Sequence, residues 1–141
     1  MDAKIRIQSK IENLDDCGLP AGDPERSDET LSGSYEYLDG RAALRYEESG
    51  DGGRVVSEIS VSGSTVTVKR TGAIESTFVF RPGEEYRTVY SVVPYKFDAI
   101  LKPRKISAEL DSEGGLVDLL YNMSIGGADK AVRMKIWIRT S

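Results

Sequence analysis

Hydrophobic and polar residues alternate along most of the chain. Ile5, Ile7 and Ile11 alternate with charged and amide residues, and Val66 and Val68 alternate with threonine and lysine. Because successive side chains of a β-strand point to opposite faces, this period of two predicts strands with one buried side. The predicted strands cover residues 3–13, 29–38, 41–48, 54–61, 64–70, 73–80, 85–92, 95–102, 104–111, 116–125 and 130–139.

Turn-forming residues separate these segments. Asp39-Gly40 and Gly126-Gly127 lie between predicted strands, and a glycine-rich turn over residues 49–53 is centred on Asp51. Glycine supplies the positive φ that tight hairpins require, and no spacer is long enough for the crossover that parallel strands need. The chain is therefore predicted to be all-β. We expect residues 1–141 to form a single closed antiparallel up-and-down β-barrel of about eight to ten strands, because closure removes exposed edges.

Two segments fit this pattern less well. Residues 14–28 are polar and contain two prolines, which predicts a long loop. Residues 116–123 are also compatible with a helix, through Leu116, Leu119, Leu120 and Met123. The alternation continues as far as Ile125 and glycine pairs flank the segment, so a strand is the favoured interpretation.

Composition narrows the possible functions. The chain has 141 residues, a formal net charge of −4, one cysteine and no histidine. The absence of histidine excludes a Ser-His-Asp triad and a histidine-based zinc site within one chain. The negative net charge argues against a nucleic-acid partner. The sequence also lacks the basic amphipathic stretch that would indicate binding to a membrane surface. No cofactor, metal site or catalytic residue is expected.

The N-terminal sequence also bears on location. It alternates charged and apolar residues, so it lacks the apolar core of a signal peptide, and the single Cys17 implies no disulfide. No run approaches the ~18 apolar residues of a membrane-spanning segment. By elimination, we expect a cytoplasmic protein.

The alternation also assigns side chains to the two faces of the barrel wall. All seven tyrosines and Arg70 fall on faces predicted to point inward. A buried tyrosine needs a partner for its hydroxyl, and a guanidinium matches carboxylates and phosphates. The candidate ligand-binding residues are Tyr46, Arg70, Ser76, Tyr90, Tyr95 and Tyr121.

Arg70 also has structural interpretations. An unpaired buried charge is very costly, so an inward arginine needs an anion or water. It could form an internal ion pair with Glu48, which shares the inward parity of Tyr46, or it could lie at the barrel rim beside Thr71-Gly72. Both interpretations stay open alongside an anchor for an acidic ligand.

Several segments carry a family resemblance. They are Val66-Thr67-Val68-Lys69-Arg70-Thr71-Gly72, Ser76-Thr77-Phe78-Val79-Phe80-Arg81-Pro82-Gly83, Tyr90, Pro94-Tyr95, Gly114-Gly115-Leu116-Val117 and Leu120-Tyr121. In order and spacing they resemble the YwiB-like family, small bacterial proteins of unknown function. The resemblance spans nearly the whole chain and implies a lipocalin-like (calycin) β-barrel, but no reaction and no ligand. This chain has Val93-Pro94-Tyr95-Lys96 where the family usually has Thr-Pro-Tyr-Gly, and its 15–27 loop is expanded.

Three functions are compatible with these features. The first is a barrel that binds a small amphipathic or acidic molecule in its interior, with Arg70 as anchor. The second is a protein-interaction module, a monomer or homodimer, which uses an outer face bearing Trp137 and Val79. The third is a histidine-free enzyme in which Arg70 lowers the pKa of a nearby tyrosine. The sequence favours the first.

Overall fold

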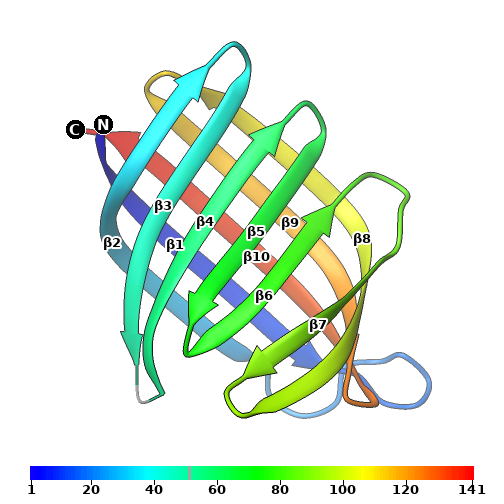
Figure 1. The fold of residues 1–141 in the computed structure, drawn as a ribbon. Helices are drawn as coiled ribbons and strands as arrows, with labels where there is room; N and C mark the ends of the chain where they lie inside the picture. The colour runs from blue at the N-terminus through cyan, green and yellow to red at the C-terminus, as the bar shows by residue number, and fades with distance from the viewer. Residues whose placement is uncertain (51) are drawn as a thin grey trace.

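Antiparallel β-strands form most of the structure (Figure 1). The computed structural model describes residues 1–50 and 52–141, so Asp51 of the predicted 49–53 turn lies outside the described residues. The described strands are β1 (Asp2–Asn13), β2 (Glu25–Leu38), β3 (Arg41–Gly50), β4 (Gly53–Ser62), β5 (Thr65–Gly72), β6 (Ile74–Phe80), β7 (Tyr86–Val92), β8 (Tyr95–Asp111), β9 (Gly114–Ile125) and β10 (Ala128–Thr140).

The sheet closes on itself. Each strand pairs with the next one along the chain, and β1 pairs with β10 from Ala3↔Thr140 to Asn13↔Lys130. Figure 1 shows β1 in blue beside β10 in red, with both termini at the same end. These ladders confirm the prediction of a closed, antiparallel, up-and-down barrel, and the described residues supply ten strands, the upper end of the predicted range.

Two predicted boundaries are wrong. Residues 95–102 and 104–111 belong to the single strand β8, which continues through Pro103 by means of a bulge between Pro103 and Lys105. A proline removes one ladder hydrogen bond, and a bulge accommodates that loss without ending the strand. The predicted 14–28 loop is shorter, because β2 begins at Glu25.

The start of β2 escaped prediction because both of its faces are polar. Residues 25–30 are exposed, yet they pair with β1 in register. Within this ladder the hydroxyls of Ser9 and Ser27 share a 2.6 Å hydrogen bond. Residues 116–123 form part of β9, which confirms the strand interpretation over the helix. No helix in the described part of the chain is long and apolar enough to cross a membrane.

Large apolar side chains fill the centre of the barrel. The largest fully buried ones are Tyr35, Phe80, Ile5, Leu101, Leu119, Ile136, Val66, Val68 and Val117. The rings of Phe80 and Tyr121 pack with centroids 4.7 Å apart. Burial of each such side chain contributes roughly 1.5–3 kcal/mol. The centre is therefore a packed core, and any ligand site must lie toward one end of the barrel.

The β2–β3 ladder stops part of the way down the barrel wall. Its last pair is Gly33↔Tyr46, although both strands continue. At that point the backbones approach closely, because a Cβ on Gly33 would clash with the carbonyl oxygen of Arg45 and lie 2.6 Å from Cδ1 of Ile5. The residues of β2 before Gly33 and those of β3 after Tyr46 are not paired with each other, so the inward side chains of these two portions can line a cavity.

We predict that Gly33→Ala destabilises the barrel. The added methyl group must displace the backbone of β3 or the side chain of Ile5, at a cost of roughly 1–3 kcal/mol typical of overpacking. Ser34→Ala, on the exposed side of the same strand, is the matched control and should change stability by less than ~0.5 kcal/mol. Urea unfolding measures both. Equal stabilities for the two variants would contradict the close approach.

Candidate functional site

A pocket opens at the end of the barrel formed by the β3–β4, β5–β6 and β7–β8 turns, which we call the mouth. Its volume is about 820 Å³. The charged residues on its lining are Glu29, Glu48, Arg54 and Arg70, and the larger apolar ones are Val55, Ile74, Val92 and Val93. The pocket therefore has both an apolar wall and a charged floor.

A smaller cavity continues the pocket into the barrel. It has a volume of about 110 Å³ and shares Glu29, Glu48 and Arg70 with the mouth pocket. Tyr46 and Met134 also line it. The three shared charged residues thus lie where the open pocket meets the packed interior.

A polar row crosses four neighbouring strands beside these cavities. Tyr46 of β3 is paired with Ser57 of β4, Ser57 with Arg70 of β5, and Arg70 with Ser76 of β6. Ser57 is 0% exposed and Ser76 is 7% exposed. Within the described residues Ser76 Oγ has no hydrogen-bond partner, whereas Ser57 lies close enough to Tyr46 for a hydrogen bond that acts to lower the pKa of that phenol. Arg70 is half-buried between these two serines and lines both cavities, which the serines themselves do not.

Two carboxylates face this row. Glu29 and Glu48 lie on the portions of β2 and β3 that extend beyond the Gly33↔Tyr46 pair. Burial raises the pKa of Glu48, the neighbouring Glu29 raises it further, and Arg70 opposes both effects. Glu48 therefore takes up a proton more readily than an ordinary glutamate.

The ion pair between Arg70 and Glu48, one of the interpretations open from the sequence, does not form. In the described part of the chain, no carboxylate oxygen lies within 4 Å of the Arg70 guanidinium nitrogens. Arg70 and Glu48 nevertheless line the same two cavities, and the charge of Arg70 acts to lower the pKa of Glu48. Arg70 therefore keeps hydrogen-bonding capacity at the junction of the two cavities.

The structure brings together some of the candidate residues and separates others. Tyr46, Arg70 and Ser76 lie in one row at the mouth. Tyr121 is buried but packs into the core. Tyr90 is half-buried, with its ring centroid 6.1 Å from that of Phe78.

Two of the tyrosines that are predicted to point into the barrel are exposed to solvent. Tyr95 is 67% exposed and Tyr37 is 37% exposed. Tyr95 is the first residue of β8 and Tyr37 is next to the last residue of β2. Alternation assigns a face to a side chain but not its depth along the barrel axis, and near a hairpin the inward face opens to solvent. Tyr95 is therefore not part of a buried site.

The buried tyrosines do not have the acidity that a catalytic base requires. Burial raises the pKa of Tyr46 and that of Tyr121, the latter to about 12, although the charge of Arg70 acts in the opposite direction. Both phenols are therefore protonated at neutral pH and can donate hydrogen bonds. No group of three or more metal-ligating side chains occurs within residues 1–50 and 52–141.

Glu29 was not among the site residues predicted from the sequence. A signal for Glu29 was present, since it shares the alternation of Leu31 and Tyr35 on β2. Because residues 14–28 were predicted to form a loop, Glu29 was the first residue of the predicted strand. At the end of a strand, alternation is a weak guide to the direction of a side chain. Its proximity to Glu48 depends on where the β2–β3 ladder stops, which alternation does not indicate.

Comparison with known proteins supports the fold. The family described as "Domain of unknown function (DUF1934)" matches residues 5–136. The "Uncharacterized beta-barrel protein YwiB" of Bacillus subtilis (strain 168) is 27% identical over 105 residues, 74% of each chain. The crystal structure of ywiB protein from Bacillus subtilis superposes with a TM-score of 0.84 at 25% identity, and covers 99% of this chain and 92% of that one. These likenesses agree with the closed barrel and name no ligand or reaction.

We predict that Glu48→Gln stabilises the protein at neutral pH. A carboxyl group whose pKa is raised on folding binds more protons in the native state than in the unfolded state, so stability falls as pH rises through that range. Glutamine keeps the shape of the side chain and cannot ionise. In urea unfolding, the advantage of Glu48→Gln should be largest near pH 8 and shrink toward pH 4.

Glu47→Gln is the matched control with the opposite sign. Glu47 is the preceding residue on the outer face, and a hydrogen bond from Arg54 lowers its pKa. Its stabilising contribution is present above the unfolded pKa and is lost in acid. Glu47→Gln should therefore be less stable than the unmodified chain at neutral pH. If Glu48→Gln behaved in the same way, attraction to Arg70 would outweigh burial and Glu29.

Proposed function

The chain belongs to the DUF1934 family of domains of unknown function, and within that family we propose that it binds a small amphipathic molecule with an acidic end. The site is the mouth pocket together with the smaller cavity below it. This places the ligand at one end of the barrel, because the centre is filled by core side chains. A cytoplasmic location, as expected from the sequence, is part of this proposal.

The observation that carries the proposal is the environment of Arg70. Its half-buried side chain lines both cavities and is paired in register with the buried residues Ser57 and Ser76. Among the described residues this guanidinium has no carboxylate within 4 Å, and a charge left unpaired at the junction of two cavities favours an anion from outside the chain. A ligand carboxylate could accept hydrogen bonds from this guanidinium.

The rest of the pocket suits the remainder of such a molecule. Val55, Ile74, Val92 and Val93 form an apolar wall close to the charged floor. Ligand pockets combine mostly apolar linings with a few polar groups that fix orientation, and this volume lies within their usual range. An apolar tail against the valines and a polar head at Arg70 would use both parts.

Glu29 and Glu48 make the binding of an acidic ligand depend on pH. An ionised ligand carboxylate would be repelled by them and attracted by Arg70. Because burial and Glu29 raise the pKa of Glu48, a proton can be taken up there when an anion approaches. We therefore expect an acidic ligand to bind more tightly at pH 6 than at pH 8.

The alternatives are less well supported. Enzymatic use of a tyrosine base conflicts with the raised pKa values of Tyr46 and Tyr121. For a homodimer, Trp137 is a weak contact, because the Arg6 guanidinium already lies over its ring at 5.3 Å. The exposed Val92 and Val93 could serve an interface, but they also line the mouth pocket and are accounted for there.

We predict that decanoate, a probe with one carboxylate and an apolar tail, binds the unmodified protein and depends on Arg70. Arg70→Met removes the guanidinium while keeping an extended apolar side chain. Loss of a charge-assisted hydrogen bond should weaken binding about tenfold or more. Isothermal titration calorimetry at pH 6 and pH 8 measures this, and 1-decanol, which lacks the carboxylate, should bind both proteins alike.

Lys69→Met is the matched control. Lys69 precedes Arg70 on the same strand, and its exposed side chain points to the opposite face. This variant should bind decanoate as the unmodified protein does. The proposal fails if decanoate does not bind at either pH, if Arg70→Met binds it equally well, or if both methionine variants lose affinity to the same extent.

A further inference from the structure

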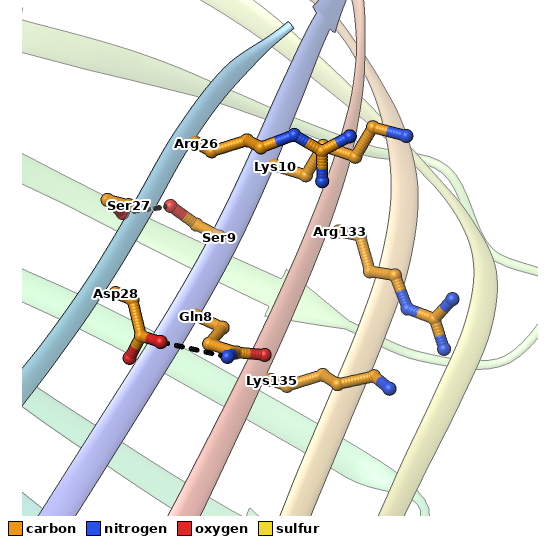
Figure 2. Close-up of a pocket in the computed structure, with 8 residues that line it drawn as sticks. All are labelled: Gln8, Ser9, Lys10, Arg26, Ser27, Asp28, Arg133 and Lys135. Carbon is orange, nitrogen blue, oxygen red and sulfur yellow. Dashed lines mark hydrogen bonds between the residues drawn. The ribbon is translucent and has the colours of Figure 1, made fainter.

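The outer face of β1, β2 and β10 carries a second groove, of about 570 Å³ (Figure 2). Its lining residues are Gln8, Ser9, Lys10, Arg26, Ser27, Asp28, Arg133 and Lys135. Lysine and arginine supply four of these eight residues and a carboxylate only one. The chain as a whole has a formal net charge of −4, so positive charge is concentrated on this face against the overall balance.

The strand register places like charges side by side. Lys10 of β1 is directly opposite Arg26 of β2 on one side and directly opposite Arg133 of β10 on the other. Like charges in cross-strand pairs destabilise a sheet. Lys10 is bonded to Glu12 at 3.0 Å and Arg133 to Asp118 at 3.2 Å, which offsets part of this repulsion. Arg26 alone of the three cations in the row has no ion pair within 4 Å among the described residues.

Two of the groove cations lack a carboxylate partner. Neither Arg26 nor Lys135 forms an ion pair within 4 Å in the described part of the chain. Asp28 is already engaged, because it accepts hydrogen bonds from Arg6 and Gln8, both at 2.9 Å. These two bonds, that from Arg6 first, lower the pKa of Asp28 to about 2. The Asp28 carboxylate is therefore engaged by Arg6, and Arg26 has no carboxylate partner. Lys135 is directly opposite Asp118 on β9, but the ion pairs of that carboxylate are with Lys105 and Arg133.

We propose that this groove binds a small anion that carries two or more phosphate groups. The cationic row crosses three strands, which at ~4.8 Å per strand spacing spans about 10 Å, more than one carboxylate can bridge. Guanidinium and ammonium groups both bind phosphate oxygens well. Figure 2 shows the side chain of Arg26 reaching towards Lys10, and those of Arg133 and Lys135 extending on the side away from β2.

This inference is independent of the proposed function, since the four groove cations line neither the mouth pocket nor the smaller cavity, and only Ser9 and Ser27 line both that cavity and the groove. Inorganic polyphosphate and the phosphate chain of a nucleotide share the required chemistry. A nucleoside triphosphate that binds more tightly than inorganic tripolyphosphate would indicate contacts to the organic part. Equal affinities would indicate that the phosphates alone are recognised.

The test is calorimetric titration with inorganic tripolyphosphate at about 50 mM salt, where exposed charges are weakly screened. The unmodified protein should bind it, and orthophosphate and citrate should bind more weakly. Arg26→Ala/Lys135→Ala should weaken binding about tenfold or more and reduce its dependence on salt. Arg26 is exposed and Lys135 is half-buried on the outer face, so the double variant should keep its thermal unfolding midpoint within a few degrees.

Lys69→Ala, which removes an exposed cation on β5, is the matched control and should leave tripolyphosphate affinity unchanged. Arg26→Gln provides a second variant, with a polar side chain and no charge, and should show an intermediate loss. The proposal is overturned if tripolyphosphate does not bind, if citrate binds as tightly, or if Lys69→Ala loses as much affinity as the double variant.

Discussion

Closure of the β1–β10 ladder is the constraint on which the other features of this molecule depend. Once the sheet is closed, every inward side chain must either pack in the core or reach solvent through an end of the barrel. The centre is filled with apolar groups, where an unpaired charge would be very costly. Arg70, Glu29 and Glu48 are inward residues that the closed barrel can accommodate only at its mouth, and the shortened β2–β3 ladder provides the space there.

The two charged sites lie on opposite sides of the same wall. Ser9 and Ser27 line both the small interior cavity and the outer basic groove, and their 2.6 Å hydrogen bond lies between the two. The inner side presents two carboxylates with one guanidinium, and the outer side presents mainly cations. This separation gives a protein of net negative charge two surfaces of different chemistry, which suit ligands of different kinds.

The sequence predicted the closed antiparallel barrel and the strand over residues 116–125, because alternation and glycine turns depend on local geometry alone. It also placed Tyr46, Arg70 and Ser76 on one inward face. It failed for Tyr95, whose depth along the barrel axis alternation does not specify, and for Glu29, whose neighbours depend on where a ladder ends. The row of Arg26, Lys10 and Arg133 was likewise not predicted from the sequence, because the register of the strands determines which residues are cross-strand neighbours. The lipocalin-like relationship implied by the family resemblance stays a prediction.

The most direct test of the account is a crystal structure of the protein grown with decanoate. We expect density for the carboxylate within hydrogen-bonding distance of the Arg70 guanidinium, with the aliphatic chain against Val55 and Ile74 at the mouth. Density for the probe only at other surfaces, with Arg70 extended into solvent or bound to Glu48, would contradict it.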